Sequence, residues 1–436
     1  MNPPAIVSYS AAREPAILNE KPRRLATEIE IQARLFNGEF GTRFVTTEST
    51  TVEILHFGEW NHEAGPDFKG ATLRFDDQPT IRGDLEVDWD ARDWERHGHA
   101  LNPAYEHVAL HLFIENPGSA AFARTPENRA IPQAILEIGG ASITPITSKP
   151  APVDIPTAAS LILIAAEFRL HRKQAAMTTA KSLHGSAAAL FHGIASCLGF
   201  KDNAIPFLIA AQRVGVRCAI GTSGEALLFG VAGFLEPRSF DDADETTRTY
   251  LKPLWDHWWT VRDKFSKLII PRASWKLSGI RPQNHPHRRL GALAAIAPLV
   301  NLLLKASASG DLKKISVYFE TLRHPFWTRH WNLSAEALKK DIALIGQDRA
   351  TDILINAVIP SLPPTQAQNA LKSIQGPSPS SRLRRACEWL VGDFQPEVAR
   401  SAFAQQGLLQ LHSDFGHLSA IEACERIRST NPPHGI

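Results

Sequence analysis

The spacing of hydrophobic residues changes along the chain. Residues 1–20 hold three prolines and show no sustained period, which predicts a flexible arm. From Arg24 to Phe36 apolar residues recur every three or four positions, as in an amphipathic helix, and Asn37-Gly38 is a typical helix end. The period then falls to two in short runs bounded by turn residues, while Asp93–His99 is compatible with a short helix. The predicted strands are Thr51–Phe57, Phe68–Phe75, Asp84–Trp89, Val108–Glu115 and one near Ala134–Ile138.

A proline-rich stretch separates this region from one with helical spacing. Residues 146–156 are the best linker candidate, and the apolar spacing beyond them is that of helices. We therefore expect an α+β fold in two parts. An N-terminal mixed-sheet domain, residues 21–145, is followed by a larger all-helical domain, residues 157–436.

Composition narrows the class of protein. The 436 residues are 44% hydrophobic and 21% charged with a net charge of +2, which excludes a disordered or fibrous chain. The longest apolar run, Leu290–Leu304, contains Asn301 and is too short for a membrane span of about 20 residues. No signal-peptide pattern opens the sequence, so we expect a cytoplasmic protein without a membrane partner. The four cysteines are widely spaced, which favours buried free thiols over disulfides or a zinc site.

Charge is divided between the two parts. Residues 1–150 contain 14 Lys and Arg against 22 Asp and Glu, a net −8, which leaves +10 for residues 151–436. An acidic region suits a carboxylate site for cations, and a basic region suits an anionic partner such as DNA or RNA. Solvated helix faces explain the same surplus equally well.

The most informative segment is an acidic hairpin. If the strands on either side of Asp76–Pro79 pair, Asp67 at the start of one lies near Glu86 at the end of the other. Period two also places Asp84, Glu86 and Asp88 on one face of the second strand. Clustered carboxylates are costly unless a cation neutralises them, so this face predicts a divalent-metal site, for Mg²⁺ or Mn²⁺. The alternative is an ordinary hairpin with a solvated acidic edge.

Three histidines suggest a mixed oxygen and nitrogen site. His97 and His99 flank Gly98, and His111 lies on the next apolar strand, so their rings could join Asp67 and Glu86 around one metal. Their spacing matches no compact zinc signature. Hydrogen-bonded structural histidines are the alternative.

The order of elements resembles the core of the PD-(D/E)xK nuclease-like superfamily. The resemblance implies that Asp67 is the first metal ligand, Glu86 the second, and Glu28 or Glu30 the acidic residue of the opening helix. Asp88 stands where the superfamily has a lysine that positions the attacking water. Asp88 could be a further ligand, and Lys69 or a histidine would have to replace the lysine.

A second resemblance covers most of the chain. Its motifs are GPDFKGA from Gly65, GDLEV from Gly83, DWERHGH from Asp93, YEHVALH from Tyr105, LFGVAGFL from Leu228 and RPQNHPHRRL from Arg281. Four of them lie near the hairpin and two in the helical part, and together they are similar to an uncharacterised bacterial family, domain of unknown function 2851. The resemblance implies one architecture for both parts and no established activity.

The last of these motifs is the densest basic segment. Its prolines exclude a regular helix, and its guanidinium groups could bind phosphate. We expect Arg281, Asn284 and Arg288 to face the cleft that holds Asp67 and Glu86. The alternative is that they tie backbone groups together where the two parts meet.

Two functions fit these patterns. The first is a divalent-metal-dependent nuclease acting on nucleic-acid phosphodiesters, with Asp67, Glu86, Asp88 and Glu28 in its site. The second is a catalytically inactive scaffold of the same kind that binds nucleic acid or protein. Nucleotide hydrolysis by a Walker motif, serine-hydrolase chemistry and a HExxH zinc site are disfavoured because their motifs are missing from the sequence.

Overall fold

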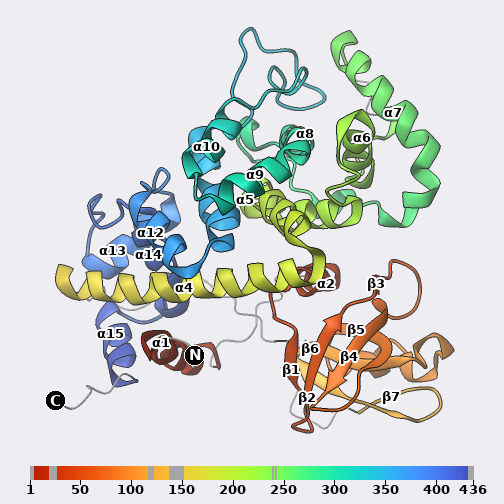
Figure 1. The fold of residues 1–436 in the computed structure, drawn as a ribbon, viewed down its shortest axis with the longest axis vertical. Coiled ribbons are helices and arrows are strands. Elements are labelled where there is room, and N and C mark those ends of the chain that lie inside the picture. Colours follow the sequence, from red (N-terminus) through yellow and green to blue (C-terminus); the bar gives the residue numbers. More distant parts are fainter. Residues whose placement is uncertain are drawn as a thin grey trace.

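A mixed sheet comes first in the chain and helices follow (Figure 1). The computed structural model describes residues 4–18, 27–115, 122–136, 152–237, 240 and 243–430. From Ile155 onward the regular elements of these residues are all helices, apart from one isolated bridge between Gln375 and Ser401. The predicted order of a sheet region and then a helical region is confirmed. Most of the predicted linker 146–156 lies outside the described residues, and its end, from Ile155, begins a helix.

The main sheet has the strand order β1-β2-β4-β5-β6-β9, with β3 paired to β4. β4 and β5 form the predicted antiparallel hairpin, with Phe68 opposite Leu85, and β5 pairs in parallel with β6, with Glu86 opposite His111. β5 is buried on both faces over most of its length. The strands are β1 Arg43–Val45, β2 Thr51–His56, β3 Glu59–Trp60, β4 Phe68–Phe75, β5 Ile81–Asp90, β6 Val108–Glu115 and β9 Gln133–Ile135; β7 Ala123–Arg124 and β8 Ala130–Ile131 form a separate pair.

The helical part is built around two long helices, α4 and α5. A kink at Phe200, whose φ is 55°, divides α5. The helices are α4 Ile155–His184, α5 Ser186–Val214, α6 Gly221–Val231, α7 Glu245–Phe265, α8 Pro286–Ile296, α9 Val300–Ala308, α10 Leu312–Glu320, α11 Gln347–Ile353, α12 Pro364–Ser373, α13 Ser381–Val391, α14 Ala402–Phe415 and α15 Ala420–Ser429.

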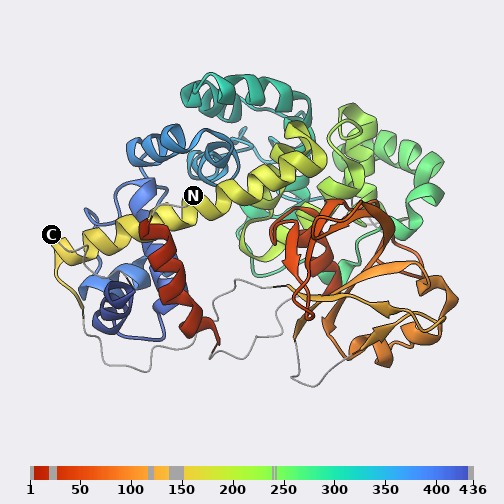
Figure 2. The same ribbon diagram turned by 60° about the horizontal axis from the view of Figure 1, so that its bottom comes forward.

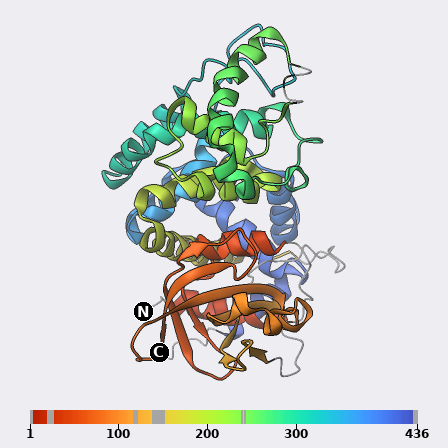
Figure 3. The same ribbon diagram turned by 90° about the vertical axis from the view of Figure 1, so that its right-hand side faces the viewer.

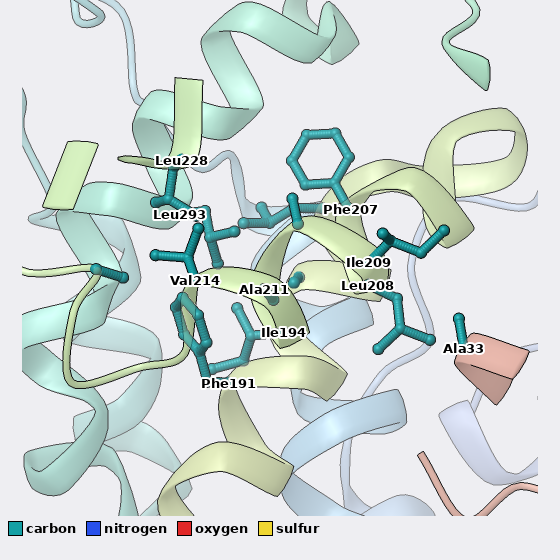
Figure 4. Packing of buried hydrophobic residues seen from close by; sticks show 14 of the residues in the cluster. Ala33, Phe191, Ile194, Phe207, Leu208, Ile209, Ala211, Val214, Leu228 and Leu293 are labelled. Atoms are coloured by element: carbon teal, nitrogen blue, oxygen red, sulfur yellow. The ribbon is translucent and has the colours of Figure 1, made fainter. Parts of the chain in front are cut away.

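Helix α2, Glu28–Phe36, connects the sheet to the helices. It lies between the two layers (Figure 3). Its buried residues belong to one hydrophobic cluster with side chains of the sheet and of α5. Figure 4 shows Ala33 of α2 beside Leu208 of α5. Because apolar area is buried continuously across this boundary, the sheet and the helices share one core.

The N-terminal segment is not the flexible arm that its prolines suggested. Pro4–Leu18 forms helix α1, which packs against α4, α14 and α15 (Figure 2). Tyr9 is fully buried and its hydroxyl donates to Asp414 Oδ2 at 3.1 Å. Pro4 begins the helix, where a proline is tolerated. Pro15 lies inside the same helix, so the prolines did not mark an irregular segment.

Two further expectations can be compared with the fold. One helical stretch, Pro286–Ala308, has the length and composition of a membrane span, longer than the apolar run suggested, yet most of it is buried in the helical core. That burial is consistent with a soluble protein. The cysteines are free, as expected, although Cys218 is exposed and only Cys387 and Cys424 are buried.

Candidate metal centre

The β4–β5 hairpin brings Asp67 and Glu86 together. The backbone N–H of Asp67 donates to Glu86 Oε2 at 3.1 Å, and the N–H of Val87 donates to Asp67 Oδ2 at 2.9 Å. Each carboxylate thus accepts a hydrogen bond from a backbone N–H at, or next to, the other residue. Glu86 is 5% exposed. The predicted convergence of these two side chains is present in the structure.

Asp88 is held by two histidines. Its Oδ1 lies 3.2 Å from His97 Nδ1, and its Oδ2 lies 3.0 Å from His111 Nε2. The amide nitrogen of Gln133 is 2.9 Å from His111 Nδ1 and donates to it, so the ring proton of His111 lies on Nε2 and is donated to Asp88. Both ring nitrogens of His111 are therefore occupied. His111 therefore holds Asp88 in position by a hydrogen bond and has no free nitrogen for a metal. Our expectation that His111 is a metal ligand is not met.

His97 and His99 reach the acidic face because the chain turns between them. Gly98 has φ 74°, a left-handed conformation that favours glycine, and the two rings lie 5.4 Å apart. One ligand atom from each of Asp88, His97 and His99 lies within 4.8 Å of the others. Such spacing would let one cation contact all three residues.

His99 carries a polar atom without a hydrogen-bond partner. The residue is 7% exposed, and its ring stacks on Tyr105 with centroids 4.0 Å apart. Its Nε2 is buried, makes no hydrogen bond, and lies 3.2 Å from Glu86 Oε1. This ring nitrogen faces the Glu86 carboxylate and is a candidate ligand atom for a cation.

The opening helix contributes Glu28 and not Glu30. Glu30 Oε2 accepts from the N–H of Thr27 in a capping box, so this side chain has a structural role. A ligand atom of Glu28 lies within 4.8 Å of one from Asp88 and one from Asp93. Asp93 in turn accepts from Arg96 at 2.7 Å. Of the two alternatives for the acidic residue, the structure places Glu28 in the cluster.

Burial and mutual repulsion disfavour the ionised form of the central carboxylates. Burial raises the pKa of Asp67 well above its usual range, and the charge of Glu86 raises it further. Burial and the charge of Asp88 act in the same direction on the pKa of Glu86, and burial also raises the pKa of Glu28. At neutral pH the cluster must either keep protons or bind a cation.

Asp84 and Lys69 were also considered at the acidic face of β5, and their side chains have other surroundings. Asp84 Oδ1 accepts from the N–H of Gly70 at 2.8 Å, so Asp84 braces the hairpin. Lys69 is exposed, and its Cε lies near the position where a Cβ on Gly65 would be. Lys69 makes no hydrogen bond to Asp67 or Glu86 among the described residues, whereas His97 does touch the cluster.

A chain of contacts that links Asp67 to helix α5 was not predicted from the sequence. Gln32 Nε2 donates to Asp67 Oδ1 at 2.7 Å, and Gln32 Oε1 accepts from Trp60 Nε1 at 3.1 Å. The guanidinium of Arg213, from α5, lies 5.7 Å from the centre of the Trp60 ring. The position of Gln32 one helical turn after Glu28 was the only available signal, since the links to Trp60 and Arg213 are long-range.

The predicted phosphate-binding residues are not at this site. Arg288 is 1% exposed, and its guanidinium donates to backbone carbonyls of Trp327, His330 and Ala343, all in the helical part. Asn284 Oδ1 accepts from Arg289. In Figure 1, α8 lies on the far side of α5 from the sheet. The expectation that this segment faces Asp67 is wrong for Arg288 and Asn284, because their polar groups hold local backbone and side chains; Arg281 is exposed.

Comparison with known proteins shows the family. The sequence model of a family described as protein of unknown function (DUF2851) matches residues 34–375, more than half of the chain. The chain belongs to the DUF2851 family. The DUF2851 match includes Asp67, Glu86, Asp88 and the three histidines, whereas Glu28 and Gln32 precede it. No curated protein and no solved structure matches this DUF2851 chain.

Proposed function

We propose that the sheet of this DUF2851 protein holds a divalent-metal centre, for Mg²⁺ or Mn²⁺, that hydrolyses phosphodiester bonds of DNA or RNA. The observations that carry the proposal are the contact between Asp67 and Glu86 and the neighbouring group of Asp88, His97 and His99, whose ligand atoms lie within 4.8 Å of one another. His99 Nε2 joins the two, since it lies 3.2 Å from Glu86 Oε1. Hard divalent cations prefer oxygen ligands. Burial first, and mutual repulsion second, raise the pKa of Asp67 and Glu86, and a cation would favour the ionised form of both.

Asp67 and Glu86 are the proposed primary ligands, since the backbone fixes both. Asp88 and His99 complete the set, with Glu28 at its edge. An all-oxygen set suits Mg²⁺, and an imidazole makes the site more favourable for Mn²⁺. When bound, the metal would activate a water molecule and stabilise negative charge on the phosphate.

His97 takes the place of the missing lysine in this proposal. Its ring is 42% exposed, and its Nδ1 lies 3.2 Å from Asp88 Oδ1. An imidazole held by a carboxylate on one side and open to solvent on the other can orient a water molecule and accept its proton. The resemblance to PD-(D/E)xK nucleases supports the same reaction class.

A second candidate function is a binding module that does not hydrolyse its ligand. The observation in its favour is Asp88, which stands in the lysine position and is bound by His97 and His111. The positive charge that we expected from Arg288 is also directed elsewhere. Such a scaffold could bind nucleic acid or a protein through its basic helical part.

Cleavage assays separate the two functions. Single- and double-stranded DNA and RNA are incubated with the purified protein and Mg²⁺ or Mn²⁺, beside Asp67→Asn and Glu86→Gln. Asp77→Asn is the matched control, because Asp77 is an exposed carboxylate in the turn of the same hairpin. Metal-dependent cleavage that only the first two variants lose supports hydrolysis. Binding without cleavage, equal in all variants, supports the binding module.

A further inference from the structure

The helical part contains a pocket that is separate from the carboxylate cluster. Its volume is about 250 Å³, and its walls come from the segment before α8, from the start of α8 and from residues 342–346. A water molecule occupies about 30 Å³ in the liquid, so the pocket has room for a small ion with several waters. The lining residues are Gln283, Arg288, Arg289, Ile342, Ala343, Leu344 and Gly346.

Two buried arginines form one wall of this pocket. The guanidinium of Arg288 donates to the backbone carbonyls of His330 and Ala343, so it holds residues 342–346, which form the opposite wall, in place. Arg289 is 4% exposed and donates to Leu344 O at 3.1 Å and to Asn284 Oδ1 at 3.0 Å. Its Nε is buried and has no hydrogen-bond partner. Arg289, a lining residue of the pocket, thus keeps one buried donor without an acceptor.

The positive charge around Arg289 is not compensated. Among the described residues, neither Arg288 nor Arg289 forms an ion pair with a carboxylate, whereas Arg349 pairs with Asp352 at 3.0 Å. Both arginines lie in the first turn of α8, which has no acidic residue, and the helix dipole adds positive potential there. Burial and the charges of Arg349 and Arg288 lower the pKa of Arg289 to about 9. Buried charges in proteins are normally paired.

We infer that this pocket binds a small oxyanion, a phosphate or a carboxylate group, through Arg289. The anion would accept from the guanidinium of Arg289 and neutralise the cationic end of α8. Gln283 can donate from its amide, and the apolar residues 342–344 leave space for a small organic portion. All these residues belong to the helical part, so the site is independent of the proposed metal centre and does not depend on the nuclease activity.

The binding can be measured by calorimetry on the full chain. Inorganic phosphate, glycerol 3-phosphate and acetate are titrated separately at constant ionic strength, with sodium chloride as the reference salt. We expect saturable binding of one anion per chain, and the tightest probe identifies the preferred oxyanion. Arg289→Lys keeps the charge and removes Nε, and it should weaken binding about tenfold or more because a charge-assisted hydrogen bond is lost. Arg281→Ala, which removes an exposed arginine outside the pocket wall, should bind as the wild type does.

Three results would overturn the inference. These are no saturable binding of any probe to the wild type, equal affinity in Arg289→Lys, or an equal loss in Arg281→Ala, which would indicate a surface charge effect. If Arg289→Lys does not fold, a crystal of the wild type soaked in tungstate gives the answer. Tungstate beside the Arg289 guanidinium supports the site, and a pocket free of tungstate at saturating concentration refutes it.

Discussion

Glu86→Gln should make the metal-free protein more stable at neutral pH and remove its stabilisation by metal. Gln has the shape of Glu, and its amide oxygen can still accept from the N–H of Asp67. Its amide nitrogen can donate to the unpaired Nε2 of His99. The substitution therefore removes the charge and keeps the packing of a residue that is 5% exposed.

The sign of the pH dependence follows from the raised pKa. Burial first, and the charge of Asp88 second, raise the pKa of Glu86 in the folded protein well above its usual value. The stabilisation from this group is therefore complete below the unfolded pKa of about 4.3, and it is lost as the pH rises through the folded pKa. Each pKa unit corresponds to about 1.4 kcal/mol. The advantage of Glu86→Gln should grow from pH 4 to pH 8.

The metal acts in the opposite direction in the wild type. At a concentration one hundred times its dissociation constant, a ligand adds about 2.7 kcal/mol to the free energy of unfolding. An unfolding entropy of about 2.1 cal/mol/K per residue gives about 0.9 kcal/mol/K for 436 residues, so Tm should rise by about 3 °C if the chain unfolds as one unit.

Thermal unfolding with Mn²⁺ or Mg²⁺ against EDTA, at pH 5 and pH 8, measures both effects. Asp77→Asn should respond to metal as the wild type does. The reasoning is refuted if Glu86→Gln keeps the metal response. It is equally refuted if this variant is less stable than the metal-free wild type at pH 8.

Three other outcomes follow from the structure. Gln32→Leu removes the hydrogen bond to Asp67 Oδ1 and should weaken Mn²⁺ binding about tenfold, as loss of a residue that supports a ligand does; unchanged affinity in a calorimetric titration would exclude this role. Arg288→Ala leaves buried carbonyls unpaired and should lower the free energy of unfolding in urea by about 3 kcal/mol or more. The rise in Tm caused by Mn²⁺ should persist in this variant. Loss of that rise would place Arg288 at the metal centre. Burial lowers the pKa of His192 to about 3, below the unfolded value of about 6.5, so the stabilisation from neutral His192 is complete above pH 6.5 and is lost as the pH falls. His192→Phe should therefore reduce the drop in unfolding free energy between pH 7.5 and pH 5 by about 2 kcal/mol. An unchanged drop would show that His192 does not titrate.

Local patterns in the sequence predicted the acidic hairpin well. Strand period, turn residues and the alternation of faces are local properties, and together they bring Asp67 close to Glu86. The choice between Glu28 and Glu30 had a signal in the sequence that we did not use. Thr27 followed three residues later by Glu30 is the pattern of a capping box, and the structure contains that capping box.

Contacts between residues far apart in the chain determine the features that the sequence did not predict. The basic segment before α8 has the composition of a phosphate-binding loop, yet Arg288 is used by carbonyls some 40 to 55 residues away in the chain. The chain of contacts from Asp67 through Gln32 to Trp60 joins three elements in the same way. A guanidinium or an amide can donate to a carbonyl, a carboxylate or a ligand, so composition alone does not identify its partner.

The most direct test of the metal centre is a crystal of the wild-type protein soaked in Mn²⁺, with the ion located by its anomalous scattering. The account predicts an ion whose ligands include carboxylate oxygens of both Asp67 and Glu86, at about 2.0 to 2.6 Å. Asp88 or His99 should complete the contacts. Saturating Mn²⁺ without an anomalous peak between Asp67 and Glu86, or with a peak only at exposed carboxylates elsewhere, would contradict it.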